Sequence, residues 1–363
     1  MIARHPSARL GPRVRQPAEL GGELATLALI RARVAAAGSM RDWGRNVRLG
    51  IGDDCALIDV KPGEEIAVTT DFSIAGRHFE LAWHPPEVIG HRVLARGLSD
   101  LAAMGARPVA AFLSLGLPKD LTGKARGAKN SARLTWIDRF YDGLLHLAGE
   151  FETPLAGGDL AESPIAAADI VLLGAVRSGK ALLRSGARPG DAIYVSGSLG
   201  GAAAGLEILK KLAGAQRGSG AGRLRIPRKI EAALARHLYP QPRVKQGLWL
   251  AKRGLAAAAI DVSDGLSTDL KHLCEESGVA AEVERGALPI SSGATLEQAL
   301  NGGEDYELLF TARPGARVPR TIAGIPMTRI GRVVKRSAKR PLVTLGTSDG
   351  REALEARGWE HFA

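Results

Sequence analysis

Apolar residues recur at helical spacing in three segments of the first half of the chain, and short apolar runs lie between them. The expected helices are Glu23–Ala37, Glu87–Met104 and Ser131–Glu150. The expected strands are Glu65–Thr70, Arg107–Leu117 and Asp169–Val176. Pro85-Pro86 opens the middle helix and Gly105 closes it, as proline and glycine commonly do at helix ends. This half therefore mixes helices and strands.

The mixture starts again after Arg184–Asp191, a segment with strong turn signals. The expected strands are Ala192–Val195, Ala256–Val262, Ala280–Glu284, Glu307–Thr311 and Thr328–Val334. The expected helices are Ala202–Lys211 and two more near Ile230 and Lys245. No fixed-period repeat is visible. The pattern predicts two α/β (α+β) domains, residues 23–186 and 187–363, with a boundary near residue 186.

Two segments differ from this pattern. Residues 1–22 form a basic stretch that no apolar segment follows, so we expect a disordered tail rather than a signal peptide. Gly214–Arg228 is rich in glycine and arginine, which predicts a flexible surface insertion. Elsewhere charge or glycine soon interrupts the longest apolar runs, so no transmembrane helix and no membrane partner are expected.

Composition narrows the classes of function. The chain has 363 residues, 45% of them hydrophobic, enough for two domains with proper cores. Its net charge of +11 suits a solubilising surface, a phosphorylated small molecule or a nucleic acid. Aromatic residues at 4% leave few platforms on which bases could stack. Cys55 and Cys274 have no metal-ligand spacing, which excludes a zinc knuckle and favours the reducing cytoplasm.

Two glycine-rich segments look like nucleotide-binding loops but each lacks an essential feature. Residues 174–181 match the P-loop pattern except at Ala181, where a serine or threonine must supply a hydroxyl to Mg²⁺. Residues 197–205 form a strand-to-helix glycine turn without the strict spacing of a dinucleotide site. We therefore disfavour a P-loop and expect the second segment to be a tight turn that packs a helix on a sheet.

Five short stretches place aspartate among small residues, several directly after an apolar run. They are Gly52-Asp53-Asp54, Thr69-Thr70-Asp71, Leu98-Ser99-Asp100, Gly157-Gly158-Asp159 and Asp261-Val262-Ser263-Asp264. Any one of them alone is more simply structural, because aspartate favours turns and helix N-caps. As a set they offer the oxygen ligands that Mg²⁺ prefers, with phosphate completing the shell. The set therefore predicts metal-assisted phosphate chemistry.

The order and spacing of these stretches resemble those of the motifs in the ATP-binding superfamily of aminoimidazole ribonucleotide synthetase and selenophosphate synthetase. Within it, the chain is most similar to the thiamine-monophosphate kinase family, from about Glu23 to Phe362. The further segments that carry the resemblance are Gly76–Phe79, Leu182–Asp191, Asp261–Leu270, Gly302–Glu307 and Gly358–Phe362. The resemblance implies a two-domain fold whose N-terminal sheet pairs with its copy in a homodimer.

The resemblance also implies an activity, the transfer of the γ-phosphoryl group of ATP to the phosphate of thiamine monophosphate, giving thiamine diphosphate in thiamine biosynthesis. Two anions must approach each other in line in such a reaction, so several Mg²⁺ ions held on carboxylates would offset their repulsion. Positioning and charge neutralisation are sufficient for such chemistry, and a nucleophilic cysteine or a Ser–His pair is not needed.

The site residues that the resemblance implies fall into three groups. The metal-binding set is Asp54, Thr69, Thr70, Asp71, Asp100, Asp159, Asp261 and Asp264, of which Asp71, Asp100 and Asp264 are also implied to be catalytic. The nucleotide contacts are Gly158, Asp159, Arg184 and Ser263, and the substrate contacts are His78, Glu304 and Trp359. An aromatic face suits the thiazolium cation of thiamine. His78 could instead be a surface histidine, and Trp359 could anchor the C-terminal core.

Two other functions stay open. One is another enzyme of the superfamily, acting on a carboxamide or a selenide, although no cysteine precedes Cys55 to serve as the reactive residue of a selenophosphate synthetase. The other is a non-catalytic phosphate- or nucleic-acid-binding module, although a complete acidic set would weaken binding to a polyanion. The chain departs from the family pattern in its basic tail, in Gly214–Arg228 and at Phe72-Ser73, where small apolar residues are more usual.

Overall fold

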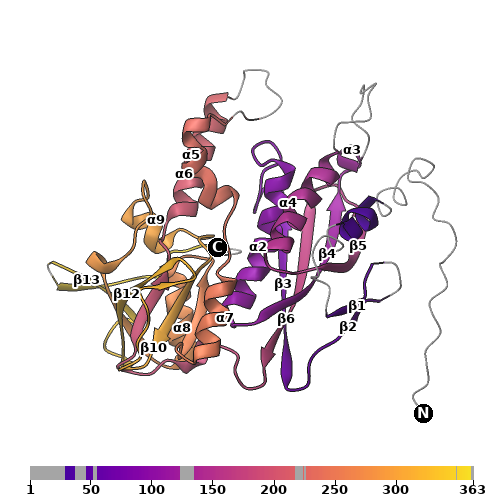
Figure 1. The fold of residues 1–363 in the computed structure, drawn as a ribbon. Helices are drawn as coiled ribbons and strands as arrows, with labels where there is room; N and C mark the ends of the chain where they lie inside the picture. The colour runs from indigo at the N-terminus through magenta and orange to yellow at the C-terminus, as the bar shows by residue number, and fades with distance from the viewer. Residues whose placement is uncertain are drawn as a thin grey trace, which may run out of the picture.

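The computed structural model describes residues 29–36, 46–51, 55–122, 135–216, 224, 226–348 and 350–360. Each half of the chain is built on its own β-sheet, and the two halves lie side by side (Figure 1). Residues 29–36 are helical, in line with the first expected helix. The expected tail at residues 1–22 lies outside the described residues. No helix within the described ranges combines the length and the apolar character needed to cross a membrane.

The first half contains a four-stranded sheet in the order β3-β6-β4-β5. Its strands are β3 (Glu64–Ile74), β4 (Arg107–Leu117), β5 (Leu155–Glu162) and β6 (Ala167–Arg177). Helices α2 (Pro86–Ala103) and α4 (Trp136–Glu150) lie over one face of it (Figure 1). A short hairpin, β1 (Val47–Leu49) and β2 (Leu57–Ile58), and the short helix α3 (Lys119–Thr122) complete this half.

Helices α2 and α4 approach each other closely because each has a glycine at the crossing. A Cβ at Gly90 would lie 1.9 Å from the carbonyl oxygen of Phe140, and one at Gly143 would lie 1.8 Å from that of Glu87. Helix α4 begins at Trp136, later than Ser131, because the side chain of Thr135 caps it together with Asp138. Residues 131–134, which the prediction included, lie outside the described residues.

Two of the aspartate stretches lie in strands rather than in loops. Strand β3 continues through Asp71 to Ile74, because all its residues pair with β6. The stretch expected to form a turn at residues 157–159 lies inside β5, so that prediction was wrong. Its glycines serve a close approach of strands, since a Cβ at Gly158 would lie 1.9 Å from the carbonyl oxygen of Leu113.

The second half contains a larger sheet in the order β14-β13-β9-β12-β7-β10-β8, with β11 paired to β12. Its strands are β7 (Ala192–Ser196), β8 (Ala258–Val262), β9 (Ala280–Glu284), β10 (Glu307–Ala312), β11 (Thr321–Ile322), β12 (Ile325–Val334), β13 (Val343–Thr347) and β14 (Gly350–Ala353). Its helices are α5 (Gly201–Gln216), α6 (Arg228–Leu238), α7 (Val244–Arg253), α8 (Leu266–Ser277) and α9 (Leu296–Asn301), with single 3₁₀ turns at η2 (Arg184–Gly186) and η3 (Arg285–Ala287). The hydrophobic pattern did not predict α8, α9, β13 or β14.

Helices α5 and α6 form a hairpin that projects from the second half (Figure 1). The segment expected to be a flexible insertion, Gly214–Arg228, contributes to this hairpin at both ends. Leu224 and Ile226 also pack against a small apolar cluster that includes Leu209 and Leu234. Where this segment is described, it is therefore anchored by apolar contacts rather than being a free surface loop.

Both glycine-rich segments have structural roles. The amides of Gly200 and Ala202, at the start of α5, donate to the carboxylate of Asp305, so the chain itself occupies the donors that a nucleotide would need. The hydroxyl of Ser178 and the amide of Gly179 bind Glu65 on the neighbouring strand.

The main hydrophobic core extends across both halves. It includes Leu94 and Leu98 of α2 together with Leu308 and Phe310 of β10. A second core cluster lies within the C-terminal half, between its sheet and α8. Burial of apolar surface is the main stabilising contribution to such an interface, so the halves are held together by packing as well as by polar contacts.

Candidate active site

A cavity of about 570 Å³ lies where the two halves meet. Residues of the first half that line it include Asp71, His78, His84, Arg96 and Asp100. Residues of the second half that line it include His237, Asp261, Asp264, Glu304, Tyr306 and Trp359. The cavity therefore draws its wall from both halves.

Helix α2 positions the polar groups of the first half. Arg92, Arg96 and Asp100 recur at intervals of four residues, so they lie on one face of a helix whose other residues are mostly apolar. Arg92 contacts Glu304, Arg96 contacts Asp71, and Asp100 accepts a hydrogen bond from the hydroxyl of Thr69. This spacing is the signal from which Arg92 and Arg96, which the sequence analysis missed, could have been found.

Three carboxylates from different elements face the cavity close to one another. Burial, and then the charges of Asp261 and Asp71, raise the pKa of Asp100 to about 8. Burial, and then the charge of Asp269, raise the pKa of Asp261 to about 7, although Ser99 donates a 2.7 Å hydrogen bond to it. Burial also raises the pKa of Asp71, and its contacts with Arg96 at 3.2 and 3.3 Å oppose this only in part. These carboxylates repel one another.

This repulsion is the feature that fits a divalent cation, because a cation would favour the charged form of each carboxylate. Across the described residues, no three histidine, cysteine or acidic side chains form a ready-made metal cage. Mg²⁺ is commonly bound by one or two carboxylates, with waters and substrate phosphates completing the shell. The donor set at Asp71, Asp100, Asp261 and Asp264 therefore suits Mg²⁺ that arrives with a nucleotide. Asp54 lies outside the described residues.

The turn after β8 is held in shape by Asp269 of helix α8. Its carboxylate accepts hydrogen bonds from the amides of Ser263, Asp264 and Gly265 at 3.0–3.1 Å. Three amide donors on one carboxylate fix the backbone of the turn, so the side chains of Ser263 and Asp264 are presented to the cavity. Asp269 lies within Asp261–Leu270, a segment that carries the family resemblance, but no role was predicted for it.

The C-terminal segment packs on the same turn. The amide of Trp359 donates to the carbonyl oxygen of Asp264 at 3.0 Å, and a Cβ at Gly358 would lie 2.2 Å from that oxygen. Glycine is therefore needed beside the tryptophan. The Trp359 side chain lines the cavity and the residue is 48% exposed, so it is not a buried core anchor.

Glu304 and Tyr306 line the cavity from a strained segment before β10. Their φ angles are +66° and +50°, in the left-handed region that residues with side chains adopt at a cost. Burial favours the neutral acid of Glu304, but the charge of Arg92, whose Nη2 lies 2.6 Å away, outweighs it and lowers the pKa to about 2. Glu304 is therefore a charged carboxylate in the cavity wall.

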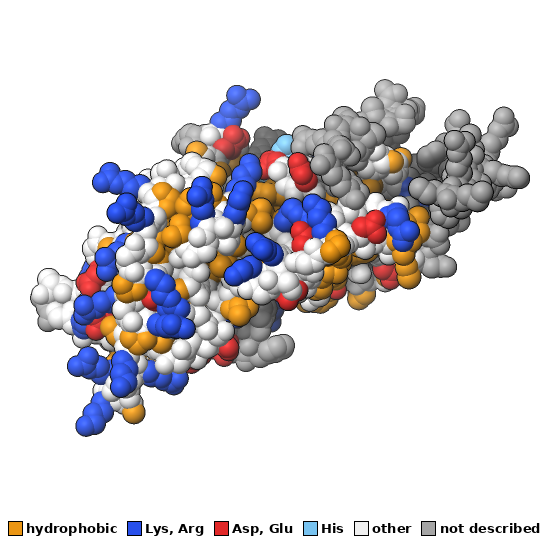
Figure 2. Space-filling view, turned by 60° about the horizontal axis from the view of Figure 1, so that its bottom comes forward, with side chains coloured by type: hydrophobic (Ala, Val, Ile, Leu, Met, Phe, Trp, Pro, Cys, Tyr) orange, Lys and Arg blue, Asp and Glu red, His pale blue; other side chains and the backbone are white. Residues whose placement is uncertain are grey.

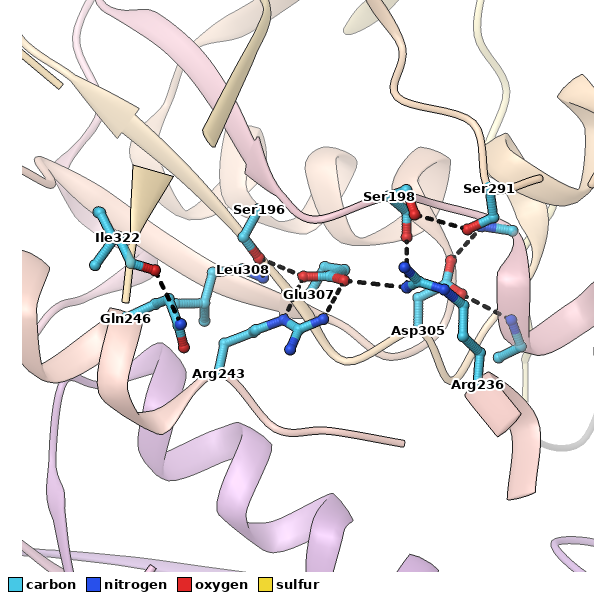
Figure 3. Close-up of polar contacts among 12 residues, drawn as sticks. Ser196, Ser198, Arg236, Arg243, Gln246, Ser291, Asp305, Glu307, Leu308 and Ile322 are labelled. Atoms are coloured by element: carbon cyan, nitrogen blue, oxygen red, sulfur yellow. Dashed lines mark hydrogen bonds and ion pairs between the residues drawn. The ribbon is translucent and has the colours of Figure 1, made fainter. Parts of the chain in front are cut away.

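The alternate residues of this segment, Asp305 and Glu307, bind the scaffold. Figure 3 shows the fully buried carboxylate of Glu307 facing the guanidinium groups of Arg243 and Arg236. The hydroxyl of Ser196 donates to the same carboxylate at 2.6 Å. Since Asp305 also holds the start of α5, these contacts oppose relaxation of the strained backbone that presents Glu304 and Tyr306.

The structure brings most, but not all, of the implied site residues to the cavity. Those that line it are Asp71, His78, Asp100, Asp261, Ser263, Asp264, Glu304 and Trp359. Thr69 contributes through its hydrogen bond to Asp100, whereas Thr70 points away from it on β3. Gly158 and Asp159 on β5, and Arg184 at η2, are exposed and do not line it. Their implied nucleotide contacts stay predictions.

The sequence analysis missed several residues of the wall. They are Arg96, His84, His237 and Tyr306, together with Arg92, which does not line the cavity but binds Glu304 in its wall. His84 and His237 are far apart in sequence and meet only because α6 packs beside the segment that precedes α2, as their 3.1 Å contact shows. No local pattern indicates such a pair. Tyr306 lies within the quoted segment Gly302–Glu307, but its spacing alone indicates no role.

Two protein-family models match this chain. The N-terminal domain of AIR synthase related proteins matches residues 52–176, and the corresponding C-terminal domain matches residues 188–343. The thiamine-monophosphate kinase of Salmonella typhimurium is 37% identical over 332 residues, which cover 88% of this chain and 93% of the relative. That of Bacillus subtilis is 33% identical over 328 residues, covering 87% and 94%.

Solved structures agree with this placement. The thiamine-monophosphate kinase of Stenotrophomonas maltophilia superposes with a TM-score of 0.69 at 36% identity, covering 86% of this chain and 94% of that protein. The AaThiL protein complexed with AMPPCP and TMP superposes with a TM-score of 0.69 at 30% identity, covering 94% and 97%. The two-domain fold and the family expected from the sequence are thus confirmed. The chain belongs to the thiamine-monophosphate kinase family of AIR synthase related proteins.

Proposed function

We propose that the protein transfers the γ-phosphoryl group of ATP directly to the phosphate of thiamine monophosphate, giving thiamine diphosphate. The observation that carries this proposal is the shared cavity, in which carboxylates from both halves lie near groups suited to an organic cation. The relative complexed with AMPPCP and TMP supports the pairing of an ATP analogue with this substrate.

The two anionic substrates need opposite charge and fixed geometry. Arg77 and Lys210 line the cavity and add positive charge beside the carboxylates. Bound Mg²⁺ on Asp71, Asp100, Asp261 and Asp264 would neutralise the charge that accumulates on the phosphates. The carboxylates stay in place because Thr69, Ser99 and Arg96 each bind one of them.

The other residues that line the cavity would orient the acceptor, thiamine monophosphate. The half-exposed ring of Trp359 offers an aromatic face to the thiazolium cation, and Glu304 offers a fixed negative charge. His78 lines the cavity beside them, and its Nδ1 accepts a hydrogen bond from the amide of Ile74. Correct orientation of two bound reactants supplies much of the acceleration in phosphoryl transfer.

The test is direct. Purified protein with ATP, Mg²⁺ and thiamine monophosphate should form thiamine diphosphate, detected by chromatography after oxidation to the fluorescent thiochrome. Unphosphorylated thiamine in place of the monophosphate should give no product, since the acceptor is a phosphate. Absence of thiamine diphosphate over a range of Mg²⁺ concentrations would overturn the proposal.

We also propose a homodimer formed through the first sheet. Ile66, Val68 and Phe72 of the edge strand β3 are exposed large apolar side chains that follow one another at every second or fourth position on the face opposite α2. The β1–β2 hairpin covers only part of this face, and a sheet with exposed apolar side chains gains stability when a second copy covers them. Phe72→Glu should shift the molecular mass in light scattering from dimer to monomer, and a wild-type monomer would contradict the proposal.

Two further expectations accompany this function. The domain boundary near residue 186 falls between the segments matched by the two family models, which supports it. Lys and Arg side chains are spread over the face shown in Figure 2, with Asp and Glu among them, rather than gathered in a single basic patch. Because aromatic residues make up only 4% of the chain and leave few platforms for bases, we keep phosphorylated small molecules, and not nucleic acid, as the expected partners, in the cytoplasm where ATP is available.

A further inference from the structure

Two buried histidines from distant segments meet in the cavity wall. His84 precedes α2 and His237 lies near the end of α6, and their Nε2 atoms are 3.1 Å apart. Burial, reinforced by the charge of Arg92, lowers the pKa of His84 to about 4 and that of His237 well below its ordinary value. Both rings are therefore neutral at physiological pH, and each carries one N–H and one acceptor nitrogen.

Hydrogen bonds around the pair decide where its protons lie. The amide of Glu80 donates to Nδ1 of His84 at 2.9 Å, so this nitrogen is an acceptor. The carbonyl of Glu80, 3.2 Å from the same nitrogen, already accepts from the amides of Trp83 and His84. The proton of His84 is then on Nε2, which donates to Nε2 of His237. His237 must consequently carry its own proton on Nδ1.

That N–H of His237 has nothing to bind within the described chain. Nδ1 is buried and has no hydrogen-bond partner there, and the nearest acidic atom is Oε2 of Glu304 at 3.8 Å, beyond hydrogen-bond distance. Arg92 holds the other oxygen of Glu304 at 2.6 Å and also binds the carbonyl of His237. A buried polar donor without a partner is costly, which points to a ligand group that satisfies it.

We propose that Nδ1–H of His237 and Oε2 of Glu304 form a donor–acceptor pair that binds the aminopyrimidine edge of the substrate. This inference rests on the proposed function. In a 4-aminopyrimidine, a ring nitrogen that accepts stands next to an amino group that donates, which is complementary to this pair. His237 and Glu304 then determine specificity, while His84 and Arg92 are positioning residues that fix the tautomer of one and the carboxylate of the other.

An analogue whose pyrimidine edge has the opposite donor and acceptor pattern tests this assignment. In oxythiamine monophosphate an oxo group replaces the amino group, so the ring nitrogen carries a proton and the exocyclic atom accepts. It would place a donor against His237 and an acceptor against Glu304. We expect the wild-type protein to use thiamine monophosphate at least about tenfold better in kcat/KM, since a site built for one hydrogen-bond pattern rejects another. Equal use of the two compounds would overturn the inference while leaving the kinase function intact.

Variants show which residue causes the preference for thiamine monophosphate over the oxo analogue. His237→Ala should raise KM for thiamine monophosphate by about tenfold or more, leave KM for ATP unchanged and reduce the preference over the oxo analogue. His237→Gln, whose amide retains an N–H, should keep part of that preference. His91→Ala is the matched control, because His91 is an equally buried histidine at the same interface that binds Pro240 and does not line the cavity. A preference unchanged in His237→Ala would contradict the assignment.

Calorimetric binding separates failure of this inference from failure of the proposed function. If the wild-type protein forms no thiamine diphosphate, binding of thiamine monophosphate and of its oxo analogue can still be compared directly. Tighter binding of the amino compound, lost in His237→Ala, would support the donor–acceptor pair. Equal binding of the two, or no binding of either, would overturn it.

Discussion

Arg243 binds the buried carboxylate of Glu307 through two nitrogens, Nε and Nη2, each 2.6 Å from a different oxygen. Arg243 precedes α7 and Glu307 begins β10, so the pair joins a helix to the strand that follows Tyr306. A bidentate pair of this kind has both geometric specificity and strength. Because Glu307 is fully buried, water cannot replace these partners.

We predict that Arg243→Ala lowers the free energy of unfolding by about 3 kcal/mol or more, since it leaves a buried carboxylate poorly compensated. Arg236→Ala removes a partner at 3.4 Å whose side chain is 44% exposed, and should cost less than about 1 kcal/mol. Arg243→Lys should not restore stability, because lysine cannot bind both oxygens. Urea unfolding of the three variants checks this, and equal losses for Arg243→Ala and Arg236→Ala would contradict it.

Asp71→Asn should reduce kcat by about a hundredfold or more, the order expected when one electrostatic contact to a transition state is lost. Its melting temperature should change little, because the amide oxygen can still accept hydrogen bonds from Arg96 while the repulsion from neighbouring carboxylates is removed. Asp142→Asn is a matched control, since Asp142 lies on α4 away from the cavity and likewise pairs with an arginine, Arg33. Steady-state kinetics would show wild-type kcat in that control, and near-normal turnover in Asp71→Asn would exclude Asp71 from the metal site.

The acidic cluster should make the metal-free protein less stable as pH rises. The pKa values of Asp100 and Asp261 in the folded protein, about 8 and about 7, lie above the ordinary value of 3.8. Their contribution to stability is therefore complete below about pH 4 and is lost as pH rises through 7 and 8. Asp100→Asn, which has no charge to repel, should be more stable than wild type at pH 9 by at least about 1 kcal/mol and similar to it only at about pH 4, where the unfolded carboxyl is also protonated.

The same cluster should respond to Mg²⁺ in a pH-dependent way. A bound cation favours the ionised carboxylates, so Mg²⁺ should raise the melting temperature more at pH 9 than at pH 6. Thermal denaturation at both pH values, with Ca²⁺-free buffer and with EDTA as the control, measures this difference. The same increase at both pH values would show that the cation binds elsewhere.

Trp359→Ala should raise KM for thiamine monophosphate by about two- to thirtyfold, which corresponds to the loss of one cation–π contact. KM for ATP should not change, because the indole is expected to face the thiazolium ring and not the nucleotide. Trp359→Phe keeps an aromatic face and should recover most of the affinity. Equal increases in both KM values would indicate that Trp359 only packs against the turn at Asp264.

The hydrophobic pattern predicted several of the packed elements, although it missed α8 and β13, which also contribute to a core. Helix α2 was expected over Glu87–Met104 and is found over Pro86–Ala103, because its residues are apolar almost all round and a proline and a glycine mark its ends. Strand β3 was expected to end before Asp71. It continues to Ile74 because its residues pair with β6. The pattern did not show this, because Asp71 and Ser73 are polar residues on the side of the sheet that faces α2.

The site could be predicted only in part for a related reason. Asp100, Asp261 and Asp264 lie in recognisable local motifs, so the sequence indicates them. His237 lies beside His84 and Glu304, which are remote from it in the chain and come together with it only when α6 and β10 pack against α2. Contacts of this range depend on tertiary structure, and no spacing within a single segment encodes them.

Helix α2 has a further consequence for the choice of substrate. From Arg92, which holds Glu304, to Asp100, which lies among the acidic groups, the helix advances by about 12 Å at 1.5 Å per residue. Because the helix is buried along this whole length, that distance is fixed. If the proposed function and the proposed ring contacts hold, the helix sets the distance between the ring-binding end and the phosphate end of the cavity. A molecule with the right ring and the right phosphate, but with a longer or shorter link between them, would satisfy one end and miss the other.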